Sequence, residues 1–318
     1  MTIDAIKQGT SEIITATNSV IEIFFLVKNA AGTLLKKADF GQGALIELKN
    51  QFINELNDKI LDNEDLSLMN ATEADQRRNV LFNYDVPDNE KHSDILKLND
   101  VIQQQHTTIP TFSFSNDGTH NIKAVIILIG NHTRQIVLYK HMYPISLFNP
   151  SHLFYFHRTN RIIENIDSDI IRINQEFDFL LLNNNYYIFN IKLLEKYYGF
   201  TNTIARVAND YLQRIETTNI VDDINTLRGR MQDLAFARKL AKAANASPVI
   251  GTVPNNDIIN FIINHPVLRT KITIDPTGSK VLLSTKNSQN AFVKLLTDDY
   301  LHSLLTNIDY NALAKDNL

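Results

Sequence analysis

The pattern of hydrophobic and polar positions changes along the chain. Residues 19–27 (SVIEIFFLV) form an apolar run rich in β-branched and aromatic side chains, which predicts a buried strand. In residues 44–60 apolar side chains recur at helical spacing with charged residues on the other face, which predicts an amphipathic helix. A second helix is expected within residues 92–105, so the beginning of the chain mixes both kinds of element.

From residue 111 onward the chain consists of short apolar runs that are separated by turn residues such as Asn116, Asp117 and Gly118. Runs of this length and spacing are typical of a meander of antiparallel strands. The clearest hairpin is expected in residues 178–189 (DFLLLNNNYYIF), where three asparagines separate two apolar runs.

The pattern becomes helical between residues 191 and 245, and residues 201–216 place their apolar side chains on one face. Residues 247–256 contain two prolines and a glycine, which is typical of a linker. A hairpin that turns at an Asp-Pro-Thr-Gly sequence is expected in residues 268–285, and helices are expected from about residue 287 to the end.

These patterns predict an α+β protein with three parts. Residues 1–200 are expected to form a mixed domain built on an antiparallel sheet. Residues 201–246 form a helical middle segment, and residues 247–318 form a small helix–hairpin–helix unit. Because the middle segment has more apolar surface than one sheet face requires, we expect it to build a homodimer or a partner interface.

Composition narrows the class of protein. The 318 residues are 44% hydrophobic and 21% charged, so the chain can bury a core. It has no cysteine, which excludes disulfides, thiolate metal sites and a cysteine nucleophile. The N-terminus does not resemble a signal peptide, and no apolar stretch approaches the roughly 20 residues that span a bilayer. We therefore expect a soluble cytoplasmic protein.

Motifs for enzymatic chemistry are missing. The chain has no phosphate-binding G-x-x-x-x-G-K-[ST] loop, no H-E-x-x-H and no G-x-S-x-G, so no cofactor and no metal are expected. A metal-dependent nuclease needs several carboxylates that converge on one site. The best candidates for such a set lie close together in the sequence: Asp167, Asp169, Glu176 and Asp178. No lysine lies between these acids, and a solvated turn is the favoured interpretation.

Basic residues gather in one stretch of a chain whose net charge is −4. Residues 226–245 contain a single acid, Asp233, and five basic residues: Arg228, Arg230, Arg238, Lys239 and Lys242. On the following hairpin we expect Arg269 and Lys271 to add to them. Clustered positive charge is what phosphate binding requires, but a solvated helix face would have the same composition.

The geometry of a helix limits how these charges can act together. Arg228 and Arg238 are ten residues apart, which places them about 280° apart around a helix axis. One straight helix therefore cannot direct all five charges at one nucleic-acid backbone. A break near Gly229, or a groove between two protomers, is required.

The C-terminal residues 294–318 contain two adjacent aspartates followed by a tyrosine. Asp298 is expected to cap the first turn of a new helix, and Asp299 to pair with a cation such as Lys294. A final helix is expected after Thr306, with Tyr310 packed inward.

This C-terminal stretch resembles the family of B components of the Kiwa anti-phage system, KwaB. The resemblance rests on Asp298, Asp299, Tyr300, Ser303, Thr306, Tyr310 and Lys315, and on the stretches FNIKLLEKYYGF and HPVLRTKI. Thr297 departs from the family pattern, in which an asparagine is expected, but it keeps a side chain that can cap.

The resemblance implies a DNA-binding effector that acts with the multi-pass membrane protein KwaA at the inner face of the membrane and blocks phage replication. Phage double-stranded DNA is the expected nucleic acid, and no catalytic residue is implied. Two alternatives remain: a metal-dependent nuclease, and a pure assembly or adaptor protein on the membrane partner.

Overall fold

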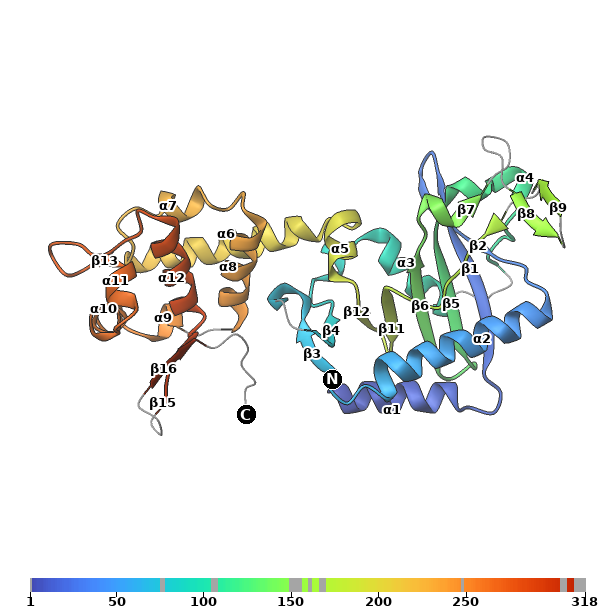
Figure 1. Cartoon of the computed structure of the whole chain (residues 1–318), viewed down its shortest axis with the longest axis horizontal. Coiled ribbons are helices and arrows are strands. Elements are labelled where there is room, and N and C mark those ends of the chain that lie inside the picture. Colours follow the sequence, from blue (N-terminus) through green and yellow to red (C-terminus); the bar gives the residue numbers. More distant parts are fainter. Residues whose placement is uncertain are drawn as a thin grey trace. The chain divides into compact units, whose positions relative to one another are not determined.

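A computed structural model gives the fold of the chain. It describes residues 2–74, 78–103, 108–148, 156–159, 162–165, 170–246, 249–303 and 308–311. The chain forms two compact units (Figure 1). Unit 1 consists of Met1–Leu68 and Asn79–Leu193, and unit 2 consists of Met69–Arg78 and Leu194–Leu318. The content of strands and helices confirms the predicted α+β class.

Unit 1 is built on an eight-stranded sheet with the order β2-β1-β5-β6-β11-β12-β4-β3, in which β3 crosses the boundary between the units. The strands of unit 1 are β1 (Val20–Asn29), β2 (Gly32–Lys37), β3 (Ser67–Asn70), β4 (Val80–Asn83), β5 (Ile122–Gly130), β6 (Gln135–His141), β7 (Leu147–Phe148), β8 (Phe156–Thr159), β9 (Ile162–Asn165), β10 (Ile170–Ile171), β11 (Phe179–Leu182) and β12 (Asn185–Ile188). Its helices are α1 (Ile3–Ile14), α2 (Gln42–Leu56), α3 (Ser93–Gln103), α4 (Phe114–Asp117) and α5 (Ile191–Tyr197), the last of which crosses the boundary.

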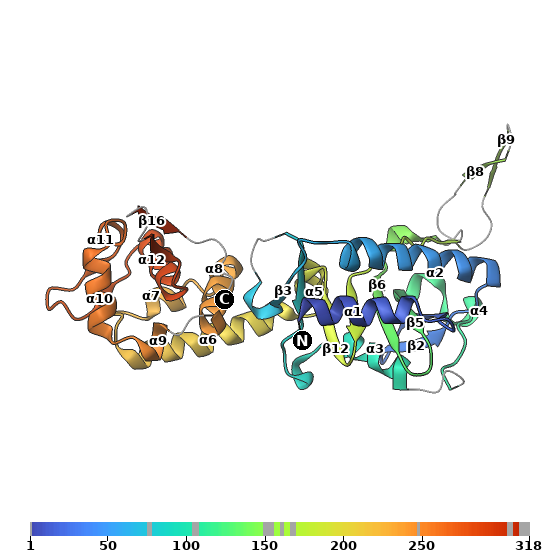
Figure 2. The ribbon, with the colours of Figure 1, turned by 90° about the horizontal axis from the view of Figure 1, so that it is seen from below.

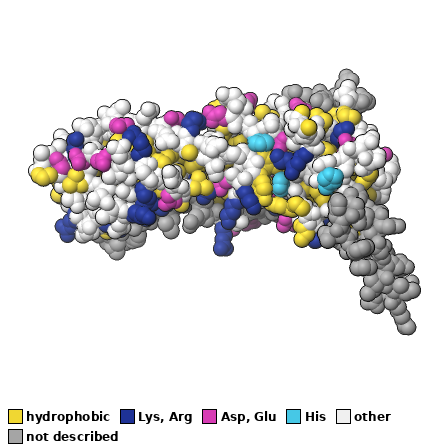
Figure 3. Space-filling view, turned by 90° about the horizontal axis from the view of Figure 1, so that it is seen from above, with side chains coloured by type: hydrophobic (Ala, Val, Ile, Leu, Met, Phe, Trp, Pro, Cys, Tyr) yellow, Lys and Arg dark blue, Asp and Glu magenta, His cyan; other side chains and the backbone are white. Residues whose placement is uncertain are grey.

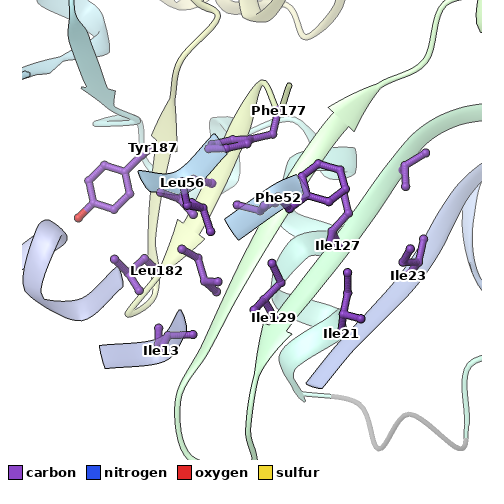
Figure 4. Close-up of a cluster of buried hydrophobic side chains, with 14 of the residues drawn as sticks. Ile13, Ile21, Ile23, Phe52, Leu56, Ile127, Ile129, Phe177, Leu182 and Tyr187 are labelled. Atoms are coloured by element: carbon purple, nitrogen blue, oxygen red, sulfur yellow. The ribbon is translucent and has the colours of Figure 1, made fainter. Parts of the chain in front are cut away.

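The strand registers place apolar side chains in rows across the sheet. Ile23 lies opposite Ile127, Ile127 opposite Leu138, and Leu138 opposite Leu180. Because side chains alternate between the two faces of a strand, this row points to one face, where it packs with α1 and α2 in a single buried cluster (Figure 4). The predicted antiparallel pairing is confirmed for β5, β6, β11 and β12, and with it the hairpin of residues 178–189. The strands β7 to β10, which lie between β6 and β11 in the sequence, pair outside this sheet.

The opposite face of the sheet is apolar as well. A second row runs from Phe24 through Ile126 and Tyr139 to Phe179, and all four side chains are inaccessible to solvent. Helix α3 packs against β6, and its apolar side chains Ile95, Leu98 and Val101 are buried. The central strands are therefore covered on both faces (Figure 2).

Unit 2 is mainly helical. Its elements are α6 (Phe200–Thr218), α7 (Asn225–Arg228), α8 (Leu234–Ala246), α9 (Val249–Thr252), α10 (Asn255–Asn264), α11 (Leu268–Lys271), α12 (Lys286–Leu296), and the strands β13 (Thr273–Ile274), β14 (Val281–Leu282), β15 (Tyr300–Ser303) and β16 (Ile308–Asn311). Helix α6 packs against α8, and α8 packs against α12.

The apolar face that was predicted for residues 201–216 is buried inside unit 2. Ile204, Ala208, Leu212 and Ile215 on α6 are at most 1% exposed. These side chains are already covered within one copy of the chain, so they offer no free surface to a second copy. The homodimer stays a prediction, and its interface would have to use other side chains.

The hairpin with the Asp-Pro-Thr-Gly turn is confirmed by the pairing of β13 with β14. Gly278 has a φ of 73°, a conformation that glycine adopts without steric cost. Asp275 organises the turn, because its carboxylate accepts hydrogen bonds from Thr277 and from the backbone N–H groups of Ser279 and Lys280. These bonds, led by the one from Thr277, lower the pKa of Asp275 to about 2.

The prediction of a final helix is wrong. Tyr300–Ser303 and Ile308–Asn311 form two antiparallel strands, with Leu301 opposite Tyr310. The helix that precedes them ends at Leu296, and the backbone turns out of the helical conformation at Asp298. The end of the described chain is therefore a hairpin, which the cap signals of the sequence did not reveal.

Within the described residues, no helix has both the length and the apolar composition that crossing a membrane requires.

Candidate nucleic-acid interface

The predicted break in the basic segment is present. Helix α7 ends at Arg228, and α8 begins at Leu234. Arg228 and Arg230 therefore do not share a helix with Arg238 and Lys242. The two halves of the segment can therefore point in different directions, which a single straight helix would not allow.

Ion pairs within unit 2 use the arginines of this segment. Arg228 lies 3.0 Å from the carboxylate of Glu216, and Arg230 lies 3.0 Å from that of Asp233. Arg238 pairs with Glu195, whose side chain is only 9% exposed. An arginine that is held by a carboxylate has less charge to offer to a phosphate, so these three are the weaker candidates for a DNA contact.

Arg230 is also fixed by neighbouring groups. Its guanidinium lies 4.5 Å from the ring centre of Phe236 and donates a hydrogen bond to the side chain of Gln289. The hydrogen bond from Arg230 lowers the pKa of Asp233. Arg230 thus links α8 and α12 and has a structural role.

Three other predicted basic residues differ from these arginines in their exposure and in their ion pairing. Lys239, Arg269 and Lys271 are exposed, and within the described part of the chain none of them forms an ion pair. Arg269 and Lys271 lie on α11, which corrects their predicted place on the hairpin. Lys242 on α8 is partly buried.

The two aspartates of the C-terminal stretch end a helix and do not begin one. The N–H of Asp298 donates to the carbonyl of Leu295, and the N–H of Asp299 donates to that of Lys294. With a φ of 54° at Asp298, this is a Schellman motif at the end of α12. The prediction that Asp298 caps the N-terminus of a helix is wrong.

Aspartate is a poor residue for this position. Glycine is usual there because L-residues are strained at positive φ, and a carboxylate is disfavoured at the negative end of the helix dipole. We expect Asp298→Gly to raise the free energy of unfolding by about 0.5–1 kcal/mol and Asp298→Ala to lower it. Thermal denaturation of the three proteins gives the order.

An Asp298→Gly protein that melts below the parent would contradict this account of the motif. If the glycine variant melts higher but no longer protects cells against phage, the carboxylate has a role in function that its place in the helix end does not explain.

Two stretches that carry the family resemblance meet in unit 2. The ring centre of His265, from HPVLRTKI, lies 5.0 Å from that of Tyr300, which follows the two aspartates. His265 is 7% exposed, and its Nδ1 accepts the N–H groups of Val267 and Leu268. Burial, followed by the charge of Asp299, raises the pKa of Tyr300. The contact packs the start of the terminal hairpin onto the body of unit 2.

The remaining residues of the C-terminal signature are only partly placed. Ser303 lies on β15 and Tyr310 on β16, whereas Thr306 and Lys315 are outside the described residues.

The acids of the nuclease alternative do not form one site in the described chain. Asp178 is buried, and its carboxylate accepts the backbone N–H of His141 and the side-chain amide of Asn190. Glu176 is exposed and lies 3.5 Å from Lys140. Asp167 and Asp169 are outside the described residues. Among the residues that are described, no group of three histidine, aspartate or glutamate side chains is arranged to hold a metal ion.

Unit 1 contains a charged cluster that the sequence did not reveal. Asp94, on the first turn of α3, is 2% exposed and accepts hydrogen bonds from Thr33 and from Lys123. Lys97 donates to the hydroxyl and the carbonyl of Thr33 at 2.8 and 2.6 Å. Burial opposes the charge of Asp94, but the hydrogen bonds from Lys123 and Thr33 outweigh it and lower the pKa of Asp94. We call Lys28, Lys97 and Lys123 the lysine cluster.

A histidine at the end of β6 makes the stability of unit 1 depend on pH. Burial, helped by nearby lysines and opposed by Asp178, lowers the pKa of His141 to about 4. Because an unfolded histidine has a pKa near 6.5, folding favours its neutral form. Its contribution is complete above pH ~6.5 and is lost as the pH falls toward 4, with a loss of about 2 kcal/mol at pH 5.

The pH dependence of unfolding by urea tests this expectation. The variant His141→Gln cannot titrate, so its stability is expected to fall less between pH 7 and pH 5. An equal fall in the two proteins would show that other groups cause the loss.

Comparison with known proteins identifies the family. Residues 119–306 match the family described as Kiwa protein KwaB-like, which is more than half of the chain. The chain belongs to this family. It is 29% identical over 320 residues to the Kiwa protein KwaB of Escherichia coli O55:H7 (strain RM12579 / EPEC), and this similarity covers 100% of the chain and 99% of the relative. No solved structure is significantly similar to the chain.

Family membership confirms the resemblance and places the chain in the Kiwa anti-phage defence system. The matched residues include all seven predicted nucleic-acid contacts and the C-terminal signature as far as Thr306. Tyr310 and Lys315 of the Kiwa signature lie beyond the match.

Proposed function

We propose that this protein is a DNA-binding effector of the Kiwa system that acts with the membrane protein KwaA and does not cleave DNA. The observation that carries the proposal is the exposure of Lys239, Arg269 and Lys271, which form no ion pair within the described residues. An unpaired cation can release counterions from a nucleic-acid backbone, whereas a paired arginine must first give up its carboxylate.

The packing of unit 2 supports a shared surface for these three residues. Lys239 lies on α8, and the other two lie on α11. Both helices pack against the same helix, α12. Basic side chains are interspersed with acidic ones on the face of unit 2 in Figure 3, so contacts are expected to depend on individual residues.

Contacts of this kind are directed at phosphates and carry no base information. The affinity should therefore depend steeply on salt and little on sequence. With three phosphate contacts, affinity for double-stranded DNA falls on the order of 40-fold between 50 and 200 mM salt.

Fluorescence anisotropy with single- and double-stranded DNA, with and without magnesium, tests the proposal. We expect binding to double-stranded DNA of two unrelated sequences with similar affinity and no loss of full-length DNA when magnesium is present. Magnesium-dependent cleavage would favour a nuclease. Binding only to KwaA, with no affinity for either form of DNA at low salt, would favour an adaptor.

A further inference from the structure

The lysine cluster of unit 1 is built by a local irregularity in the central sheet. In the pairing of β1 with β5, Leu26 lies opposite Ala124 and Val27 opposite Ile122, so that Lys123 is an extra residue. A bulge of this kind redirects a side chain and is common beside functional sites. Lys123 is the one residue of β5 that is not fully buried. Its ammonium group reaches the carboxylate of Asp94 at 2.5 Å.

The lysines of the cluster outnumber the acid that holds them. Lys97 donates to a hydroxyl and a carbonyl oxygen, which are both neutral acceptors. Lys28, whose Cα lies opposite that of Thr33, is exposed and forms no ion pair within the described residues. Asp94 therefore compensates one of the three positive charges. Lysine is a common partner of phosphate groups, which would supply the missing negative charge.

Two histidines lie beside the lysines, and the pKa of each is lowered. Burial is the largest cause that lowers the pKa of His92 and of His141. Asp94 opposes the shift of His92, Asp178 opposes that of His141, and Lys123 adds to both shifts. Nδ1 of His92 accepts the N–H of Asp94, so that its other nitrogen carries the proton. Neutral imidazoles can donate hydrogen bonds to an anion without adding to the repulsion among the lysines.

An aromatic side chain lies next to this charged group. The ring of Tyr143 contacts that of His141 edge-on at 4.9 Å and is 40% exposed, and the neighbouring Ile145 is 77% exposed. On the face of unit 1 in Figure 3, lysine or arginine side chains lie among histidines with apolar side chains beside them. A ligand that has both a phosphate and a planar ring matches this combination.

We propose that the lysine cluster binds the phosphate groups of a mononucleotide and that Tyr143 contacts its base. Lys97 on α3 and Lys123 on β5 converge on one threonine and one carboxylate that are hydrogen-bonded to each other, and Lys28 on β1 lies opposite that threonine. Such convergence suits a compact polyphosphate, whereas a nucleic-acid strand requires charges that are spread along its backbone. This site is separate from the DNA contact that we propose for unit 2.

Calorimetric titration of the full chain with ATP, pyrophosphate and adenosine tests the site. ATP and pyrophosphate are expected to bind, and adenosine is expected to show no binding. The variant Lys28→Gln/Lys97→Gln should lower the affinity for ATP and for pyrophosphate by at least about tenfold. Arg134→Gln/Lys192→Gln removes two exposed charges elsewhere in unit 1, since Arg134 lies in the turn at the other end of β5, and should leave both affinities unchanged.

A tyrosine variant separates the two parts of the ligand. Tyr143→Ala should lower the affinity for ATP by about tenfold, because the tyrosine no longer stacks on the base. The same change should leave the affinity for pyrophosphate unchanged. Lys28→Gln alone changes an exposed side chain, so it shows the loss even if the double variant folds poorly.

The proposal is overturned if neither ATP nor pyrophosphate binds at millimolar concentration, or if the lysine variants bind them as the parent does. It is also overturned if the parent binds no nucleotide and the same variants no longer bind double-stranded DNA. The cluster would then be a nucleic-acid contact. DNA binding that persists in variants without nucleotide binding would show two independent sites.

Discussion

Reversing the charges of Lys239 and Lys271 together is expected to weaken the binding of double-stranded DNA by more than about tenfold at moderate salt. The two residues lie on different helices of unit 2, and both are exposed. The double change to glutamate should leave folding intact, because neither lysine forms an ion pair within the described residues. Fluorescence anisotropy gives the affinity, and thermal denaturation checks the fold.

The variant Arg172→Glu/Lys192→Glu is the matched control. It alters the net charge by the same amount at exposed positions of unit 1. Equal weakening in the two variants would mean that overall charge, and not the surface of unit 2, decides the affinity. Arg238 is a poor choice for such a test, since a glutamate there would face the nearly buried Glu195 and destabilise unit 2.

Asp178→Ala is expected to lower the free energy of unfolding by about 3 kcal/mol. The substitution leaves the buried backbone N–H of His141 and the partly buried amide of Asn190 without their acceptor. Each buried donor that loses its partner costs about 1–3 kcal/mol. Unfolding by urea measures the loss.

Glu176→Ala provides the comparison two residues away. Its side chain is 65% exposed and its ion pair with Lys140 is long, so the change should cost less than about 0.5 kcal/mol. Similar effects of the two substitutions would contradict the structural role of Asp178. Loss of a DNA-cleaving activity in a stable Asp178 variant would favour the nuclease alternative.

The fold of unit 1 could be predicted largely from local patterns. Apolar runs at regular spacing and turn residues between them define the strands, and the asparagines at 183 and 184 adopt the positive φ that their turn requires. The first helix, Ile3–Ile14, was not predicted, although Ile6 and Ile13 are in the core. In a stretch this short, only tertiary packing shows which apolar side chains share a face.

The charge of the basic segment could not be predicted from the segment alone. Counting residues 226–245 finds one acid, but the carboxylates of Glu195 and Glu216 come from elements outside that range. In the same way, the network around Asp94 joins residues from α3, β2 and β5. The bulge that presents Lys123 exists only once β1 and β5 are paired, so no spacing in the sequence announces it.

The C-terminal hairpin shows a different limit. Threonine and asparagine act as helix caps in many proteins, but they occur as readily in turns, and both residues are frequent in this chain. Asp298 at positive φ decides the direction of the chain after α12, and aspartate does not signal that conformation as glycine would.

The slope of the logarithm of DNA affinity against the logarithm of salt concentration is the most direct measurement of the central claim. Each phosphate contact with double-stranded DNA contributes about 0.9 to this slope. Neutralising the three exposed cations with Lys239→Gln/Arg269→Gln/Lys271→Gln should therefore make the slope less steep by about 2.7 relative to the parent. Parallel slopes for the two folded proteins would show that DNA is bound elsewhere and would contradict the account.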